Sequence, residues 1–329
     1  MSKNGLRFWL GLAISAVALY LAFRNTSWPE LAAALLGVNW FLLSAGLVTE
    51  GVSFAARGWR WQVLLLPLKR VPAWETFEYL IIGYMGNNLL PFRLGEIARA
   101  VLLAQEQNLS KTASLATVVV ERLLDVLSLI VLIVIVTLQM EIPAELKGSL
   151  AALELMAAAA LSGLLFAAWA DQRHLDRLEA LYSRLPLGFG PVFKRLLGSF
   201  IQGLGVLRSA RGMGLVVVHS ALAWLLGVVA TYLFLAAVGV WLPWYGAAFV
   251  LAAVNVGISV PSSPGYVGVF HYVVVLALAL WAVPRSIALS FALIFHGLPY
   301  IITVALGLFF LWRKGLALGQ LQKADLSPQ

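Results

Sequence analysis

The sequence of 329 residues contains no cysteine. This absence excludes disulfide bonds, thiolate metal sites and a cysteine nucleophile. The four histidines, His174, His219, His271 and His296, are scattered without the spacing of a metal site. A Gly-rich phosphate loop followed by Lys and Ser or Thr, a GxSxG motif and an HExxH motif are also missing. The sequence therefore predicts no metal, no cofactor and no recognised catalytic residue.

Charged residues are scarce as well, at 12% of the chain, whereas about 25% is usual for a soluble domain. Hydrophobic residues make up 61%, and the mean hydropathy is +0.91. A water-soluble chain of this size could not remove so much apolar surface from solvent. We therefore expect an integral membrane protein. The net charge of +8 comes with no aromatic stacking pattern or nucleic-acid-binding motif, so nucleic acid is not an expected partner.

The apolar stretches predict an all-α polytopic membrane fold with residues 1–329 as one integral membrane domain. Since a span needs roughly 20 apolar residues, six stretches qualify: 7–23, 40–57, 112–140, 148–170, 214–240 and 287–312. Two further apolar regions, 76–106 and 245–283, are broken near their middle by Pro and Gly. Each half is short for a crossing of the hydrocarbon core, so we predict two broken re-entrant helical hairpins; the alternative is that each region forms two full spans.

Basic residues support this layout. With the N-terminus on the cytoplasmic side, residues 58–75, 171–213 and 313–329 lie inside and carry thirteen Lys and Arg, whereas the outside loops carry three: Arg24, Lys147 and Arg285. Such a bias marks the cytoplasmic side. The prediction is a multi-pass protein of the cytoplasmic membrane of a prokaryote, with both termini inside. The basic loop 171–213 is expected to form surface helices on anionic lipid.

The two broken regions share a pattern. Pro91 to Gly95 and Pro261 to Gly265 are both P-x-x-x-G, with Pro264 inside the second, and asparagine precedes each. Residues 40–140 and 214–312 form two units, each made of a span, a broken hairpin and a second span. The two hairpins enter the membrane from opposite sides. This is the inverted repeat found in many transporters. The alternative interpretation is two Pro-kinked helix pairs that serve packing alone.

Ionisable residues inside apolar segments need a partner or water. Arg93, Glu96 and Arg99 follow the first break at i, i+3 spacing, and Glu121, Arg122 and Asp125 lie in the 112–140 span. Arg93 or Arg99 could pair with Glu121 or Asp125 and seat the hairpin, or the same residues could line a water-filled cavity in which an arginine binds phosphate. Both interpretations can hold together.

Other polar residues in the apolar segments have two interpretations each. Ser259, Ser262 and Ser263 could bond freed carbonyls or contact a headgroup. Glu50, His271 and His296 could relay protons or be packed polar groups. Five tryptophans are predicted to be interfacial anchors: Trp59 and Trp61, beside Arg57 and Arg60, and Trp241, Trp244 and Trp281.

Four segments, RGWRWQVLL, NNLLPFRLGEIARAVLL, ATVVVERLLDVLSL and SVPSSPGYVGVFHY, resemble the flippase-like membrane domain of lysylphosphatidylglycerol synthases over about residues 5–313. The resemblance implies translocation of an anionic, aminoacylated or polyprenyl-linked lipid between leaflets. It assigns importance to twelve residues: Asn88, Pro91, Arg93, Gly95, Glu96, Arg99, Glu121, Arg122, Asp125, Pro261, Pro264 and Gly265. A soluble aminoacyl-transferring domain follows the membrane part in full synthases and is absent from this sequence, so synthase activity is not expected.

The leading hypothesis is thus a lipid transporter that works by alternating access, with membrane lipids as partners. The alternatives are a membrane enzyme or accessory subunit in lipid-linked sugar or aminoacyl-lipid synthesis, and a scaffold that docks a lipid-modifying enzyme through the basic loop. The lipid, the energy coupling and the oligomeric state stay open.

Overall fold

The computed structural model describes residues 3–140, 204–260 and 262–322, with six isolated positions between 140 and 204. All secondary structure in these ranges is helical, as predicted. The predicted span 148–170, most of the basic loop 171–213, and Pro261 lie outside the described residues. The elements are α1 (Lys3–Phe23), α2 (Trp28–Leu36), α3 (Trp40–Leu65), α4 (Ala73–Leu89), η1 (Pro91–Arg93), α5 (Leu94–Gln107), α6 (Lys111–Thr137), η2 (Leu204–Arg208), α10 (Ala210–Ala237), α11 (Trp244–Gly257), η3 (Pro264–Tyr266), α12 (Val269–Ala279), α13 (Arg285–Arg313) and α14 (Leu318–Gln322).

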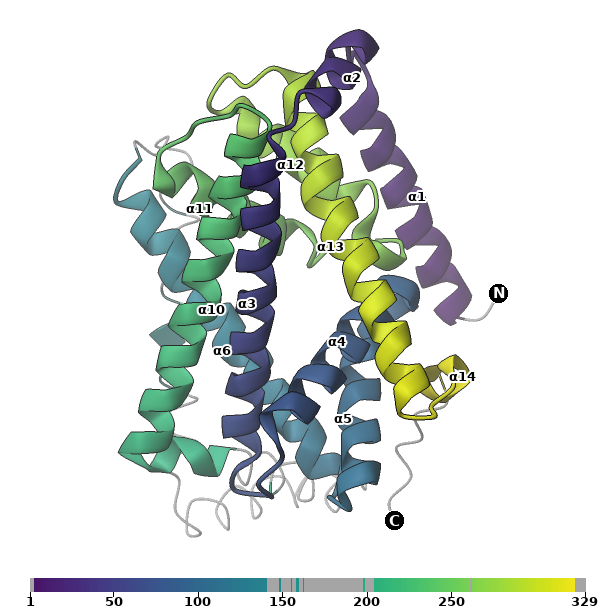
Figure 1. Ribbon diagram of the computed structural model, residues 1–329, viewed down its shortest axis with the longest axis vertical. Helices are drawn as coiled ribbons and strands as arrows, with labels where there is room; N and C mark the ends of the chain where they lie inside the picture. Colours follow the sequence, from purple (N-terminus) through teal and green to yellow (C-terminus); the bar gives the residue numbers. More distant parts are fainter. Residues whose placement is uncertain are drawn as a thin grey trace.

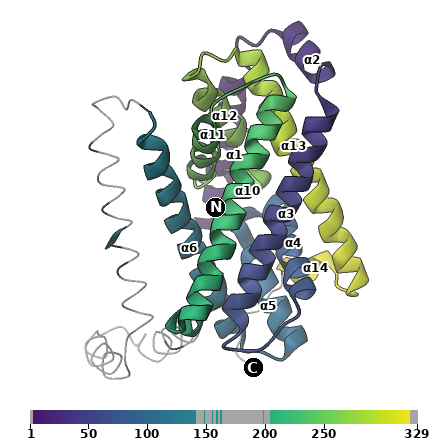
Figure 2. The same ribbon diagram turned by 60° about the vertical axis from the view of Figure 1, so that its left-hand side comes forward.

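Four long helices form the frame. α3, α6, α10 and α13 contain 26, 27, 28 and 29 residues, which corresponds to about 39–44 Å of helix. Side chains fix their starts: Asn39 accepts hydrogen bonds from the backbone of Phe41 and Leu42, and Ser209 accepts one from Gly212. α3 and α10 pack along each other in the centre, and α6 lies at one edge of the bundle (Figures 1 and 2).

Two of these helices, α10 and α13, combine the length and apolar character of a membrane span. The pair α1 and α2, bent by 88° at its break, would make a third. α3 and α6 have the length but carry charged residues such as Arg57 and Glu121 along their middle. The described residues thus establish an all-helical fold, and the full count of six spans stays a prediction.

The two broken regions fold as antiparallel helix pairs. In the first hairpin, α4 and α5, the Gln107 amide donates to Glu75 at 2.5 Å, so both open ends lie together. In the second, α11 and α12, the rings of Phe249 and Trp281 are 5.4 Å apart. Figure 1 places the first hairpin toward one end of the bundle and the second toward the other. Each pair therefore returns to the end from which it starts.

The turns explain why Pro and Gly interrupt these regions. Pro91 opens the short helix η1, and Arg93 adopts a left-handed conformation with φ of 54° before α5 begins. Pro264 opens η3, and Gly268 has φ of 91°. Gly95 was expected at the break itself but lies inside α5. There a Cβ would come within 2.0 Å of the Gly83 carbonyl oxygen, so glycine permits the close approach of α4.

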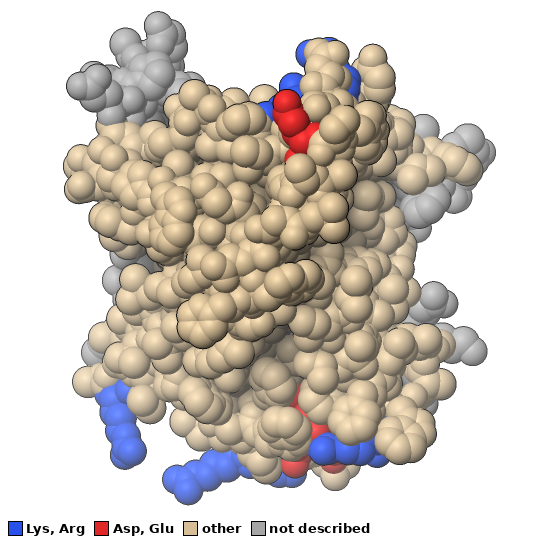
Figure 3. Space-filling model, turned by 45° about the horizontal axis from the view of Figure 1, so that its top comes forward, with Lys and Arg blue, Asp and Glu red and all other residues tan. Residues whose placement is uncertain are grey.

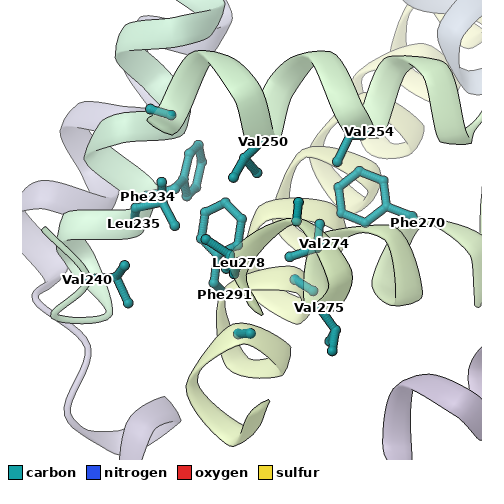
Figure 4. Close-up of a cluster of buried hydrophobic side chains, with 14 of the residues drawn as sticks. Phe234, Leu235, Val240, Val250, Val254, Phe270, Val274, Val275, Leu278 and Phe291 are labelled. Atoms are coloured by element: carbon teal, nitrogen blue, oxygen red, sulfur yellow. The ribbon is translucent and has the colours of Figure 1, made fainter. Parts of the chain in front are cut away.

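The packed interior consists of two hydrophobic clusters, one around each hairpin. Figure 4 shows the cluster of the second hairpin, where Phe234 of α10 and Phe291 of α13 meet Leu278 of α12. The other cluster is built around Trp61 of α3 and Tyr79 of α4. Because each hairpin has its own core, their tips are held at fixed positions relative to the long helices.

On the face shown in Figure 3, charged side chains are confined to the two ends of the molecule. In Figure 3 the Lys, Arg, Asp and Glu side chains lie at opposite ends, and a broad belt of other residues separates them. Large hydrophobic side chains such as Phe41, Val131, Leu225 and Ile301 are more than half exposed in this fold. Such a belt fits the hydrocarbon region of a bilayer, with charges confined to the ends.

We predict that Gly95→Ala destabilises the fold. A Cβ there would overlap the backbone of α4, and overpacking of this kind typically costs about 1–3 kcal/mol. Thermal unfolding in detergent should show a lower midpoint than for the parent protein. Gly214→Ala in α10 is the matched control because nothing lies within 4 Å of its added Cβ. An equal midpoint for both variants would contradict the proposed close packing.

Candidate functional site

A cavity of about 470 Å³ lies inside the bundle. Its wall comes from the long helices α3, α6, α10 and α13 and from the tips of both hairpins. The charged residues that line it are Glu50, Arg57, Arg93, Glu96, Arg122 and Asp125, and aromatic rings fill much of the remaining wall. The cavity thus combines three arginines and three carboxylates with aromatic and aliphatic side chains, a composition suited to an amphipathic ligand.

The two hairpin tips meet at this cavity. The guanidinium of Arg93, in the first tip, donates to the carbonyl oxygen of Ile258 in the second at 3.1 Å and lies 5.6 Å from the centre of the Tyr266 ring. Asn88 donates to Thr303 of α13 at 3.0 Å, and a Cβ on Gly265 would lie 3.3 Å from the Asn88 carbonyl oxygen. The expected pairing of Arg93 with Glu121 or Asp125 is therefore absent, because Arg93 points to the opposite hairpin.

Beside the cavity, three arginines converge on one carboxylate oxygen. Glu121 Oε1 lies 2.5 Å from Arg122, 3.0 Å from Arg99 and 3.6 Å from Arg60. The expected bridge between Arg99 and Glu121 is thus confirmed, and it joins α5 of the first hairpin to α6. Since charge-assisted bonds are the strong ones in a low-dielectric interior, this group fixes the hairpin against the long helices.

Asp125 forms the second half of the cluster. Its carboxylate lies 2.8 Å from Arg60, 3.0 Å from Arg122 and 3.3 Å from Arg57. Arg122 also lies 3.7 Å from Glu96 of α5. The three helices α3, α5 and α6 are therefore tied together by ions rather than by apolar contacts alone.

Burial divides this cluster into two layers. The side chains of Arg60, Arg99 and Glu121 are at most 1% exposed, whereas that of Arg122 is 32% exposed. Arg122 lines the cavity and its Nε has no hydrogen-bond partner. The inner layer is structural, and the outer layer presents arginine donors to whatever occupies the cavity.

Arg57 and Arg60 were not recognised from the sequence as site residues. They were grouped with Trp59 and Trp61 as an interfacial anchor, and Arg60 was counted in a cytoplasmic loop. Instead α3 continues to Leu65, and Arg60 and Trp61 are fully buried. The Trp61 indole donates to Thr117 at 3.0 Å, and Arg99 lies 4.4 Å from its ring centre. The available signal was the spacing of charged residues: Arg57 and Arg60 are three residues apart, and Glu50 lies seven residues before Arg57.

Of the other predicted residues, Ser259 and His296 lie in the cavity wall, whereas Ser262, Ser263 and His271 lie behind it. Ser263 bonds to Ser15 of α1 at 2.9 Å, and Ser262 Oγ is buried without a partner. Ser259 lines the cavity and donates to the Asn255 carbonyl oxygen. His296 lines the cavity and stacks on Phe270 at 4.5 Å, with His271 edge-on behind it at 5.1 Å.

Residues that the sequence did not single out complete the wall. Trp224 of α10 lines the cavity, lies 5.5 Å from the Arg57 guanidinium and leaves its indole N–H without a partner. Asn87 and Tyr84 of α4 also line it. Among the described residues, no group of three His, Cys, Asp or Glu side chains could hold a metal ion.

We predict that Glu121→Gln strongly destabilises the fold, since removing one partner of a buried ion pair costs about 3–5 kcal/mol. Three arginines would then face a neutral amide in the inner layer. Glu96→Gln is the control, because Glu96 is 18% exposed and makes one contact at 3.7 Å. Thermal unfolding in detergent should separate the two variants clearly, and equal losses would argue against a structural inner layer.

Comparison with known proteins agrees with this membrane fold. The family described as "Lysylphosphatidylglycerol synthase TM region" matches residues 8–307, which include all of the described cavity wall. No curated protein and no solved structure matches the chain. The family points to a membrane protein with a lipid-related role. On the extent of this match, the chain belongs to the lysylphosphatidylglycerol synthase transmembrane-region family.

Proposed function

We propose that this protein is a flippase-like lipid transporter, which moves an anionic, aminoacylated or polyprenyl-linked lipid between leaflets. The observation that carries the proposal is the cavity between the hairpin tips, whose wall includes Arg93, Arg122 and Arg57. Arg93 donates to the Ile258 carbonyl oxygen, and Arg57 and Arg122 pair with Asp125. A phosphate-bearing headgroup would offer these guanidinium groups further acceptor oxygens, and arginine binds two phosphate oxygens at once.

The proposed topology has six spans and two re-entrant hairpins in an inverted repeat, with both termini in the cytoplasm of a prokaryote. Supporting it, the open end of the first hairpin lies beside the end of α13, where Lys314 contacts Glu78 at 3.2 Å and Glu106 at 3.0 Å. The open end of the second hairpin has the exposed Trp241 and Trp244 beside it. Tryptophans are enriched at both membrane interfaces, so their exposure agrees with this end lying at a membrane face.

Transport would proceed by alternating access around the cavity. The headgroup would bind at Arg93 and Arg122 while the acyl or prenyl chains remain in lipid. Arg93 joins the two tips through Ile258 and Tyr266, so a phosphate that competes for its guanidinium would loosen the contact between the hairpins. Ligand binding and the relative position of the tips would then be linked.

A membrane enzyme acting on a lipid-linked sugar is less well supported. The two buried carboxylates of the cluster, Glu121 and Asp125, are each ion-paired with three arginines, which disfavours a role as general base or metal ligand. These two carboxylates therefore have a structural role rather than a catalytic one. The scaffold hypothesis rests on the basic loop, which lies largely outside the described residues.

The first test is lipid translocation by the purified protein in liposomes containing fluorescent phosphatidylglycerol. Arg93→Ala should slow translocation by roughly 10- to 100-fold, which corresponds to the loss of a charge-assisted bond of about 1.5–3 kcal/mol. Arg70→Ala is the control, because Arg70 is exposed and does not line the cavity. Translocation that is absent in the parent protein, or unchanged in Arg93→Ala, would refute the proposal.

The second test concerns topology and uses the natural absence of cysteine. A single cysteine at Lys69 or Gln107, at the open end of the first hairpin, should react with a membrane-impermeant thiol reagent only from the cytoplasmic side. A cysteine at Gly239 or Ala282, beside the second hairpin, should react only from the outside. Labelling of Lys69→Cys and Gln107→Cys from opposite sides would mean that this region crosses the membrane.

A further inference from the structure

Glu50 differs from the other carboxylates of the cavity wall. Asp125 and Glu96 have arginines within 4 Å, whereas Glu50 has no ion pair among the described residues. It lies on α3, two helical turns from Arg57, and both residues line the cavity. An unpaired carboxylate in a partly buried position inside a membrane protein is costly when ionised and much less so when protonated.

The surroundings of Glu50 suit a proton better than a metal cation. α3 packs on α10, where Ser53 donates to the Ala223 carbonyl oxygen at 2.9 Å, and α10 adds Trp224 and Gly227 to this wall. α11 adds Leu251. A sodium- or calcium-sized ion needs several oxygen ligands, and this apolar wall offers one carboxylate.

The other ionisable groups that line the cavity come from neighbouring elements. α4 contributes Tyr84, and α6 contributes Arg122 and Asp125, which pair with each other. Arg93 and Glu96 follow the first break, while Tyr266, His296 and Tyr300 face from the second tip and α13. α10 adds no titratable side chain to the cavity. Among the described residues, Glu50 is therefore the acidic group of this wall with no arginine or lysine within 4 Å, and Arg57 acts on it only at longer range.

Charge balance gives the direction of the linkage. The ionisable residues of the cavity and of the ion cluster behind it comprise five arginines and four carboxylates, so the site has an excess of one positive charge when Glu50 is ionised. Protonation of Glu50 raises this excess to two and favours an anion. By reciprocity, a bound anion favours the protonated form of Glu50.

We propose, on the basis of the transport function above, that Glu50 is a proton-coupling site and that one proton accompanies each anionic headgroup across the membrane. The carboxylate takes a proton from the compartment to which the cavity opens and forms an O–H bond. It releases that proton after the headgroup leaves on the other side. A singly charged headgroup and one proton carry no net charge, so a pH gradient drives the cycle and the membrane potential does not.

The histidines serve this role less well. His296 stacks on Phe270 and faces His271 at 5.1 Å, with no carboxylate bonded to either ring among the described residues. A proton on His296 would add positive charge directly beside a second imidazole. Glu50 can gain and lose its proton without such a neighbour.

The test measures binding of a short-chain phosphatidylglycerol to the detergent-purified protein by calorimetry, at about pH 5.5 and about pH 8, in buffers of different ionisation enthalpy. We expect the parent protein to take up close to one proton per lipid bound at the higher pH. We also expect it to bind the lipid about tenfold more tightly at the lower pH, a change in affinity of the size usual for two coupled sites. Glu50→Gln mimics the protonated acid, so it should bind tightly at both pH values without proton uptake.

Two further variants keep the result interpretable. Glu50→Asp retains an ionisable group and should retain proton uptake, and Glu30→Gln, on the exposed surface of α2, should behave like the parent protein. Equal proton uptake by the parent protein and Glu50→Gln, or none by the parent protein, overturns the inference. Loss of uptake in His296→Gln with retention in Glu50→Gln overturns it in favour of the histidine.

Translocation assays separate this inference from the proposed function. If a pH gradient accelerates lipid movement in liposomes with the parent protein but not with Glu50→Gln, the result supports both the transport function and the proton coupling. Movement that ignores the gradient supports transport and overturns the coupling. Linked binding of lipid and proton without any movement keeps Glu50 as a proton-binding site and refutes the transporter.

Discussion

A charge inside an apolar molecule must be neutralised, and in this protein the neutralisation of Glu121 organises the structure around it. Arg60 from α3, Arg99 from α5 and Arg122 from its own helix all reach one carboxylate oxygen. These bonds join the first hairpin to two long helices in a region where contact with lipid would provide little driving force for association. Polar bonds therefore supply a specific register that apolar packing alone would leave open.

The ion cluster also determines what the cavity can bind. Arg60 and Arg99 are buried and engaged, so they hold the geometry and cannot reach a ligand. Arg122 also pairs with Glu96, Glu121 and Asp125, but its side chain is 32% exposed and, like Arg93, it lies in the wall. The difference follows from position in the fold, because all four residues have the same chemistry. A phosphate headgroup would meet only the outer arginines, while the inner ones keep them in place.

The second constraint is the meeting of the two hairpin tips. Each tip interrupts a helix, and the interrupted backbone must find partners away from water. The Ile258 carbonyl oxygen, near the end of α11, accepts from Arg93, and the Asn88 side chain bonds to Thr303. Residues more than 160 positions apart thus complete each other's hydrogen bonds. A contact of this kind can break when a ligand offers better acceptors, which is the physical requirement for a moving part.

Much of this arrangement was accessible from the sequence. The apolar composition predicted the fold class, and the combination of Pro with nearby Gly predicted where both helix breaks lie, because proline removes a backbone hydrogen-bond donor. A proline alone is not sufficient, since Pro299 lies inside the continuous helix α13. The need for partners in hydrocarbon predicted an ion pair between Arg93 or Arg99 and Glu121 or Asp125, and the fold contains the one between Arg99 and Glu121. The predicted end of the α3 span was wrong, because a segment that contains Arg57 and Arg60 is typical of a membrane interface when the carboxylates that pair with them are not known.

What the sequence determined by itself was the presence of two helix breaks and of charges that need neutralisation within hydrocarbon. Only the tertiary structure decided how those charges pair: Arg60 with Glu121 and Asp125, Arg93 with the opposite hairpin, and Glu50 with no close ion pair among the described residues. The reason is that pairing depends on which helix faces are brought together across long separations. Local spacing places residues on a face of a helix, but the packing of α3, α5 and α6 chooses the face that each one meets.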